Sequence, residues 1–266
     1  MKNPLRKRLP RELKEDLGKY LVIFLFMVLL ISLVSGFLVA DNSIMDAYQK
    51  GFDQYNVEYG NFSTKNAIAS KDRKAIEKEN KLILYEQNYY ELKESKKNAT
   101  IRIYGMRKKV NTLCLMSGTY PKKDNEIALD RVYAKNNNYK NNETIRIAGK
   151  NYTITGMVAL PDYSCLFSDN ADMMFDSVNF GVAVITDKAL TQLDQNKLTY
   201  NYAWYYQKEP KDDAAQKKMS DRFLEKLTKK VIITSYVPRY ANKAINFTGD
   251  DMGGDAAMMT ALLYII

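Results

Sequence analysis

The sequence predicts an α+β protein in which one N-terminal transmembrane helix continues into a stalk that carries a two-lobed domain. Three observations predict this arrangement. A long apolar segment without charges lies near the N-terminus, helix and strand patterns alternate at both ends of the remaining chain, and strand patterns dominate its middle. We therefore expect an α/β lobe with an inserted β-rich lobe.

Residues 20–40, "YLVIFLFMVLLISLVSGFLVA", contain no charged side chain. As a helix this segment is about 31 Å long, which matches the hydrocarbon thickness of a bilayer. A cleaved signal peptide is the competing interpretation, but its apolar region is shorter, and no small-x-small cleavage site precedes Asp41. The segment is predicted to be a transmembrane helix in the lipid bilayer.

The flanking charges predict the orientation of this span. In the twenty residues after it only Lys50 is basic, whereas the positive charges before it are Lys2, Arg6, Lys7, Arg8, Arg11, Lys14 and Lys19. Because basic residues stay in the cytoplasm, residues 1–19 are predicted to be cytoplasmic and residues 41–255 extracytoplasmic. Within residues 1–19, Leu9, Leu13 and Leu17 recur at a spacing of four, which is typical of an amphipathic helix at the inner membrane surface.

Small side chains recur along one face of the span at Ser32, Gly36 and Ala40. Such a face allows another helix to approach closely, although small residues are common enough in spans for the spacing to arise by chance. These three residues are our candidate helix-packing site. Beyond the span, a helical stripe from Ile44 to Tyr55 predicts that the helix continues outward, despite a cost of about 1 kcal/mol at Gly51.

The extracytoplasmic part starts with a charged helix near residues 71–79, followed by strand patterns in "KLILYEQNYY" and "TIRIYGM". The β-rich lobe is placed at about residues 106–178 and includes a hairpin with its turn at Ala148-Gly149-Lys150. The strands "FGVAVITD" and "KVIITSYV" then flank a helix at residues 211–229. That helix has apolar residues every fourth position.

Composition and motifs exclude several kinds of chemistry. The chain has no histidine, which removes Ser/His triads and imidazole zinc sites, and it has no P-loop, so it cannot be its own ATPase. We assign no catalytic, cofactor-binding or metal-binding residues and expect no cofactor. The net charge of +9 is scattered and not gathered along a track, so nucleic acid is not an expected partner.

Two acidic segments are candidate calcium sites. "TGDDMGGD" brings together Asp250, Asp251 and Asp255, but it lacks the spacing of a calcium loop, so a flexible acidic linker is the favoured reading. "DYSCLFSDNADMMFD" carries four further aspartates without a ligand pattern, and we predict a surface loop there.

An aromatic row and two cysteines complete the candidates. A strand would place Tyr200, Tyr202, Trp204 and Tyr206 on one face, where packing is favoured over the stacking of sugars or peptides. Cys114 and Cys165 are read as unpaired residues of a β-rich core, with one disulfide as the alternative.

The final residues 256–266 form an apolar run about 16 Å long as a helix, roughly half of what a span needs. We expect this run to be the start of a second transmembrane helix that is cut short, which would make the chain a fragment.

The chain resembles the FtsX-like and MacB-like permeases of ABC transporters, in the long form found in Firmicutes. The segments that carry the resemblance are "NPLRKRLPRELKEDLGKYLVIFLF", "GTYPKKDNEIALDRVYAKNN", "ETIRIAGKNYTITGMV", "DMMFD", "FGVAV" and "GDDMGGDAAMM". One departure is Asn141-Asn142-Glu143, where the family usually has a glycine before the strand, although asparagine also tolerates a left-handed turn.

This resemblance implies a permease subunit that binds a separate cytoplasmic ABC ATPase and pairs with a second permease copy or half. It also implies that the first helix couples the ATPase to movement of the extracytoplasmic domain. The alternative from a different class is a singly anchored extracytoplasmic binding or sensor domain. A membrane-tethered enzyme is the least favoured reading because histidine is absent.

Overall fold

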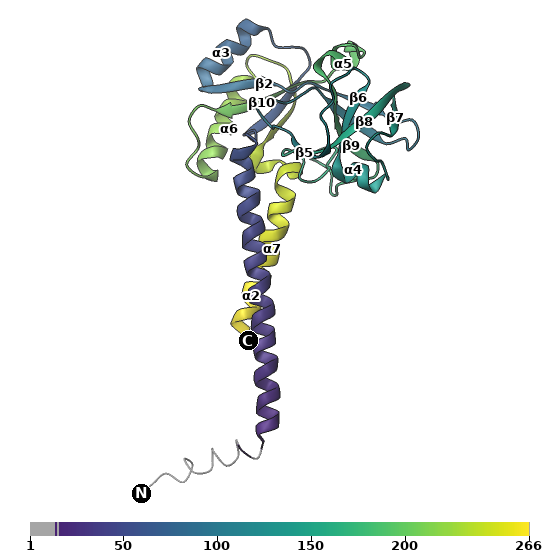
Figure 1. Cartoon of the computed structure of the whole chain (residues 1–266). Coiled ribbons are helices and arrows are strands. Elements are labelled where there is room, and N and C mark those ends of the chain that lie inside the picture. The colour runs from purple at the N-terminus through teal and green to yellow at the C-terminus, as the bar shows by residue number, and fades with distance from the viewer. Residues whose placement is uncertain (1–13, 15, 266) are drawn as a thin grey trace. The chain divides into compact units, whose positions relative to one another are not determined.

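The computed structural model describes residue 14 and residues 16–265 (Figure 1). The described chain forms two compact units. One contains the residues up to Gln49 and those from Gly249 onward, and the other runs from Lys50 to Thr248. Most of the predicted cytoplasmic segment, including Leu9 and Leu13, lies outside the described residues.

The first unit consists of parts of two long helices, α2 (Leu17–Gln54) and α7 (Lys243–Ile265). Among the described residues, α2 is the one helix whose length and composition suffice to cross a membrane. It continues through Gly51 without a break, so the expected extension of the helix into a stalk is confirmed. An added Cβ at Gly249 of α7 would lie 2.8 Å from Cε1 of Tyr48 in α2, which indicates that glycine permits the close approach of these helices.

The expectation of a flexible acidic linker is wrong, because Asp250, Asp251 and Asp255 all lie within α7. Each glycine in this stretch costs about 1 kcal/mol of helix stability. However, the first turn of α7 is fixed by the buried side chains of Ala244 and Ile245, so the helix starts from an anchored nucleus and needs only to propagate.

In the second unit, the small lobe is an antiparallel sheet of order β11-β1-β10-β2 with two helices. Its elements are β1 (Gly60–Thr64), α3 (Ser70–Asn80), β2 (Leu82–Glu86), β10 (Tyr200–Tyr206), α6 (Asp213–Leu227) and β11 (Ile233–Pro238). The 3-10 turn η2 (Arg239–Ala241) joins β11 to α7. Both predicted helices are therefore present, with ends within two residues of those expected.

One face of this sheet and the two helices enclose an aromatic core. Trp204 is fully buried, stacks on Tyr236 with ring centroids 4.9 Å apart, and meets Phe223 of α6 edge to face at 5.3 Å. Phe62 stacks on Tyr202 at 5.4 Å. Tyr202, Trp204 and Tyr206 of the aromatic row are buried, so they pack in the core as favoured.

The inserted lobe lies between β2 and β10 in the sequence, as predicted, and contains a seven-stranded mixed sheet. Six strands follow the order β3-β4-β9-β6-β8-β5, and β7 pairs with β8. The elements are β3 (Tyr89–Lys93), β4 (Thr100–Tyr104), β5 (Cys114–Gly118), β6 (Glu126–Asp130), α4 (Arg131–Asn136), β7 (Thr144–Ile147), β8 (Lys150–Ala159) and β9 (Phe180–Val184). The turns α5 (Asp187–Thr191) and η1 (Gln195–Lys197) lead back to the small lobe.

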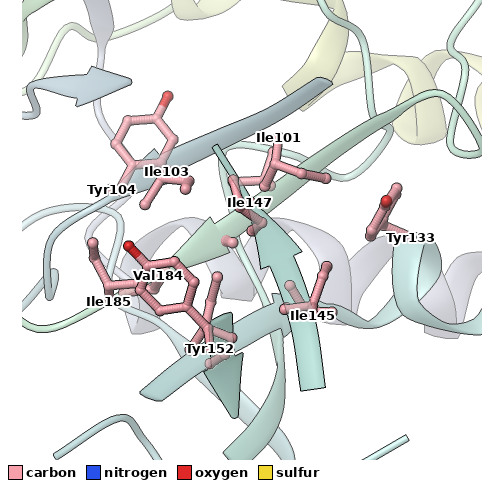
Figure 2. Packing of buried hydrophobic residues seen from close by; sticks show 14 of the residues in the cluster. Ile101, Ile103, Tyr104, Tyr133, Ile145, Ile147, Tyr152, Val184 and Ile185 are labelled. Carbon is pink, nitrogen blue, oxygen red and sulfur yellow. The ribbon is translucent and has the colours of Figure 1, made fainter. Parts of the chain in front are cut away.

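Aliphatic side chains dominate the core of the inserted lobe (Figure 2). Ile101 and Ile103 of β4 gather with Val184 of β9 and with Ile145 and Ile147 of β7. All five residues of β9 are buried, as expected for a central strand that is covered on both faces. Tyr104 follows Ile103 directly in β4 and so points to the opposite face, toward the small lobe.

The predicted bounds of the β-rich lobe, about residues 106–178, are too narrow. Its sheet also contains β3 and β4 before these bounds and β9 after them, because β4 pairs in parallel with β9. The sequence pattern of these strands does not reveal their partners. The predicted hairpin is present, with Ala148 (φ 49°) and Gly149 (φ 83°) as its two-residue turn between Ile147 and Lys150.

Candidate functional site

A partly open pocket of about 150 Å³ lies between the two sheets of the second unit. Strand alternation explains why the small lobe contributes polar groups to it. In β1, Phe62 points into the aromatic core, whereas Asn61 and Ser63 on the opposite face line the pocket. Ser63 donates a hydrogen bond from its hydroxyl to Oδ1 of Asn201 at 3.0 Å. The polar face of the small sheet is therefore covered by the inserted lobe, with a pocket left between them.

Arg102 of β4 forms one wall of the pocket. Its Nε and Nη2 donate to Oε1 of Glu91 at 2.9 and 2.5 Å, and its Nη1 donates to the hydroxyl of Tyr163 at 2.7 Å. Nη2 also donates to the carbonyl of Ser168 at 2.7 Å. Its guanidinium carbon lies 4.6 Å from the centre of the Tyr89 ring. These hydrogen bonds engage all three guanidinium nitrogens of Arg102 and link β4 to the loop after β8.

Arg107 and Asp162 form a buried ion pair in the same pocket. The Nη1 atom of Arg107 donates to Oδ1 of Asp162 at 2.6 Å, and the two side chains are 3% and 8% exposed. The guanidinium lies 3.9 Å from the centre of the Tyr104 ring. The Nε atom of Arg107 is buried without a hydrogen-bond partner. Desolvation of the two charges offsets much of the attraction between them. The buried ion pair is therefore weak evidence for a purely stabilising role.

Glu58 is the third ionisable group of the pocket and is only 2% exposed. Its Oε1 accepts from Nδ2 of Asn61 at 2.5 Å, and its Oε2 accepts from Nδ2 of Asn111 at 2.7 Å. Burial, followed by the negative charge of Asp162, raises the pKa of Glu58 to about 7. This carboxyl group therefore changes its charge near neutral pH.

Asn111 forms hydrogen bonds with both the side chain and the backbone of Glu58. Its own Oδ1 accepts from the backbone N–H of Glu58 at 2.9 Å, and its backbone N–H donates to the carbonyl of Asn56 at 3.0 Å. Asn111 is fully buried in a left-handed conformation, with φ at 48°. The orientation of the Glu58 carboxyl group is thus set by Asn61 of the small lobe and Asn111 of the inserted lobe together.

The aspartates of the loop after β8 form no metal cluster, and no group of three or more candidate metal ligands occurs among the described residues. Asp172 accepts from the Asp169 N–H at 2.9 Å, and Asp176 accepts from the N–H groups of Val178 and Asn179. These acids stabilise turns of the surface loop, as predicted. Asp162 is the exception to the prediction, because its pairing with Arg107 keeps it buried.

The candidate helix-packing residues Ser32, Gly36 and Ala40 are all exposed on α2. An added Cβ at Gly36 would meet nothing within 4 Å. Val34 and Asp41, at other positions of the helix, are the buried residues of α2 in this unit. The small-residue face is left open within the described chain, so its role in packing stays a prediction.

Cys114 and Cys165 are both free, as predicted, but both are only partly buried and so lie at the margin of the core. Sulfur Sγ of Cys165 lies 3.6 Å from the hydroxyl of Thr248, and Cys114 lies in the edge strand β5.

Sequence reasoning missed Glu58, Arg102 and Arg107. Arg107 and Asp162 are 55 positions apart, and Glu58 and Asn111 are 53 apart. No local pattern joins residues at such separations. The one related feature that the sequence suggested is a left-handed asparagine. Asn142, before β7, adopts this conformation with φ at 69°.

Comparison with known proteins gives a structural likeness and no sequence match. No protein-family model matches the chain, and no curated protein matches it. The periplasmic region of MacB from Actinobacillus actinomycetemcomitans aligns with a TM-score of 0.39 and 13% identity, over 72% of this chain and 91% of that chain. The extracellular domain of the noncanonic ABC-type transporter YknZ from Gram-positive bacteria aligns with a TM-score of 0.35 and 8% identity, over 66% and 99% of the two chains.

Proposed function

We propose that the chain is part of a permease subunit of an ABC transporter, in which α2 crosses the membrane and couples a separate cytoplasmic ATPase to movement of the extracytoplasmic lobes. The proposal is supported by the resemblance of six sequence segments and by the apolar N-terminal half of α2. The observation that carries it is the continuity of α2, which is 38 residues long and therefore extends about 57 Å as one helix.

Within the second unit, the residues that follow α2 are hydrogen-bonded to both lobes. The carbonyl of Tyr55 accepts from the N–H of Thr112 in the inserted lobe at 2.9 Å. Tyr59 donates its N–H to the carbonyl of Trp204 in the small lobe at 2.9 Å and accepts from Arg239 at 2.8 Å. A displacement of the end of α2 would therefore be transmitted to both lobes through residues 55–59.

The partners are part of the same proposal. The ATPase binds on the cytoplasmic side, and a second permease copy or half packs beside α2, with the open face at Ser32, Gly36 and Ala40 as the candidate contact. The N-terminus is cytoplasmic because of its basic residues, and the lobes are outside. The chain itself carries no catalytic role.

Replacing residues 42–45 of α2 with Gly-Ser-Gly-Ser tests this coupling in the transporter that contains the chain. Four glycine and serine residues break the helix, so we expect ATP hydrolysis to continue while transport or resistance activity is lost. The matched control replaces the same residues with four alanines, which keeps the helix and should retain activity. Equal activity of both variants would refute the coupling role of α2.

A singly anchored binding domain is the second candidate, and the buried charged groups of the pocket between the lobes favour it. Purification of the chain from its native membrane separates the two. An ABC ATPase in stoichiometric amount supports the permease. Recovery of the chain alone, under conditions that keep known transporters assembled, supports the anchored domain.

A further inference from the structure

The pocket between the lobes contains more buried negative charge than its cations neutralise. Arg102 is paired with Glu91, and Arg107 is paired with Asp162. Glu58 has no ion pair with a lysine or arginine of the described chain, although it lines the same pocket and is almost completely buried. Its two hydrogen-bond donors are neutral amides. Ionised Glu58 therefore leaves the pocket one positive charge short.

We propose that this pocket binds a small molecule, or the end of a larger one, through a protonated amine that is received by Glu58 and Asp162. An ammonium group supplies the missing charge and several N–H donors at once, and both carboxyl groups line the pocket. This inference does not depend on the transport function.

The titration of Glu58 agrees with this assignment. Burial and the charge of Asp162 raise its pKa to about 7, against the opposing effects of Asn61, Asn111 and Arg107. Arg107, the cation whose charge acts on Glu58, is already engaged by Asp162. A bound ammonium group would favour the ionised carboxylate and so lower its pKa again.

Both arginines of the pocket are already engaged by carboxylates of the protein, which disfavours an anion at this site. Every nitrogen of the Arg102 guanidinium donates to Glu91, Tyr163 or Ser168. In Arg107 the Nη1 atom is bonded to Asp162 and the Nε atom has almost no exposed surface, which leaves only Nη2 to meet a ligand. An anion entering here would also meet Asp162 and Asp169.

The size and the walls of the pocket limit the ligand further. An apolar cavity of about 150 Å³ in another protein holds one benzene molecule, so about six non-hydrogen atoms fit here. The wall also carries the buried amides of Gln87, Asn201 and Asn242, beside apolar side chains such as Phe167 and Val237. A short amine with further polar atoms suits this lining better than a hydrocarbon.

Binding of a cation to Glu58 and proton binding by Glu58 exclude each other. Below a pKa of about 7 the ligand must displace a proton, so its affinity falls as the pH is lowered. Aliphatic amines stay protonated up to about pH 10, so they contribute no opposing change between pH 6 and 8. We therefore expect about tenfold tighter binding at pH 8 than at pH 6.

Calorimetric titration of the full chain in detergent with 1,4-diaminobutane and n-butylamine tests the proposal. Both amines are expected to bind at millimolar concentrations or below, with proton release at pH 6.5. Neutral n-butanol and anionic n-butyrate are expected not to bind. A short peptide with one lysine distinguishes the end of a larger ligand from a free amine, because only a pocket that is open to peptides accepts both.

Two variants localise the binding. E58Q removes the charge and is expected to weaken binding at pH 8 at least tenfold and to abolish its pH dependence. The matched control E94Q changes another buried glutamate, which lies outside this pocket, and should bind normally. S235F adds a ring at an exposed position of the pocket wall and should also block binding if E58Q fails to fold.

Several results would overturn the proposal. These are equal binding of n-butanol or n-butyrate, unchanged affinity in a folded E58Q variant, and the absence of binding by any amine to the folded wild-type chain.

Discussion

The two lobes of the second unit are built in opposite ways. The strands of the inserted lobe follow one another from Tyr89 to Val184, and its core is mostly aliphatic. The small lobe joins chain segments from both sides of this insertion, because β1 at residues 60–64 pairs with β10 at residues 200–204. Its core is mostly aromatic.

This difference predicts that the small lobe depends on the inserted lobe, but not the reverse. The ends of β2 and β10 are held together by the edge of the inserted lobe, where Tyr89 bridges to Thr199 and Gln87 donates to the carbonyl of Asn201 at 2.8 Å. Loss of the inserted sheet leaves a loop of more than a hundred residues between β2 and β10, whose closure is entropically unfavourable. Trp204 is the single tryptophan of the chain, so its fluorescence reports on the small lobe alone.

The largest effect is expected for Gly60→Ala in the small lobe. An added Cβ would lie 2.7 Å from Cα of Pro238 and 2.3 Å from Cη2 of the buried Trp204, and φ at this position is +155°. We expect a loss of about 3 kcal/mol or more in the free energy of unfolding, measured by denaturant titration of Trp204 fluorescence. Far-UV circular dichroism should show that the inserted lobe unfolds later.

Gly253→Ala is the matched control, because an added Cβ at this helical position meets nothing within 4 Å. Simultaneous loss of both lobes in Gly60→Ala would contradict their unequal dependence.

Gly181→Ala tests the inserted lobe in the same way. An added Cβ in β9 would lie 2.5 Å from Cγ of Tyr133, whose ring is fully buried. We expect a loss of about 2 to 3 kcal/mol, because the ring must shift within a packed core. In this variant the fluorescence of Trp204 and the circular dichroism should change together. A small lobe that stays folded while the inserted lobe is unfolded would contradict the predicted dependence.

Glu58 links the two lobes and makes their stability depend on pH. Its folded pKa of about 7 lies above the ordinary value of 4.5, so the folded state holds more protons between these pH values. Stability therefore falls as pH rises through this range. E58Q should remove that part of the slope and gain about 2 kcal/mol relative to the wild type between pH 5 and pH 8. Parallel stability curves for the two proteins would contradict the raised pKa.

The smallest effect is expected at the hairpin turn. Gly149 has φ at +83° and open space around it, so Gly149→Ala introduces strain but no clash. We expect a loss of about 1 kcal/mol in the stability of the inserted lobe, measured by thermal unfolding. Gly149→Asn is the control, since asparagine tolerates the left-handed conformation and should lose less. Equal losses in both variants would show that φ at this position is not the cause.

Local features of the fold could be predicted from the sequence. The long helix, the hairpin at Ala148 and Gly149 and the helix α6 all follow from spacing within a few residues. Each depends on apolar periodicity or turn chemistry that the chain carries locally.

Features that depend on distant residues could not be predicted. The parallel pairing of β4 with β9 joins strands 80 positions apart, and it is this pairing that extends the inserted lobe beyond the predicted bounds. Asp162 looks like its acidic neighbours in the sequence, and only the position of Arg107 makes it a buried ion. The helix through Asp250 was not predicted, because the anchored first turn of α7 compensates for the helix-destabilising glycines of this segment.

The central proposal is that the chain crosses the membrane through α2 with its N-terminus inside and both lobes outside. Labelling of single cysteines in intact cells with a membrane-impermeant maleimide tests it directly, in a background that carries Cys114→Ala and Cys165→Ala. Met173 is 95% exposed in the loop after β8, so Met173→Cys should be labelled in intact cells. Lys2→Cys should be labelled only after permeabilisation. Labelling of Lys2→Cys but not Met173→Cys in intact cells would contradict the account.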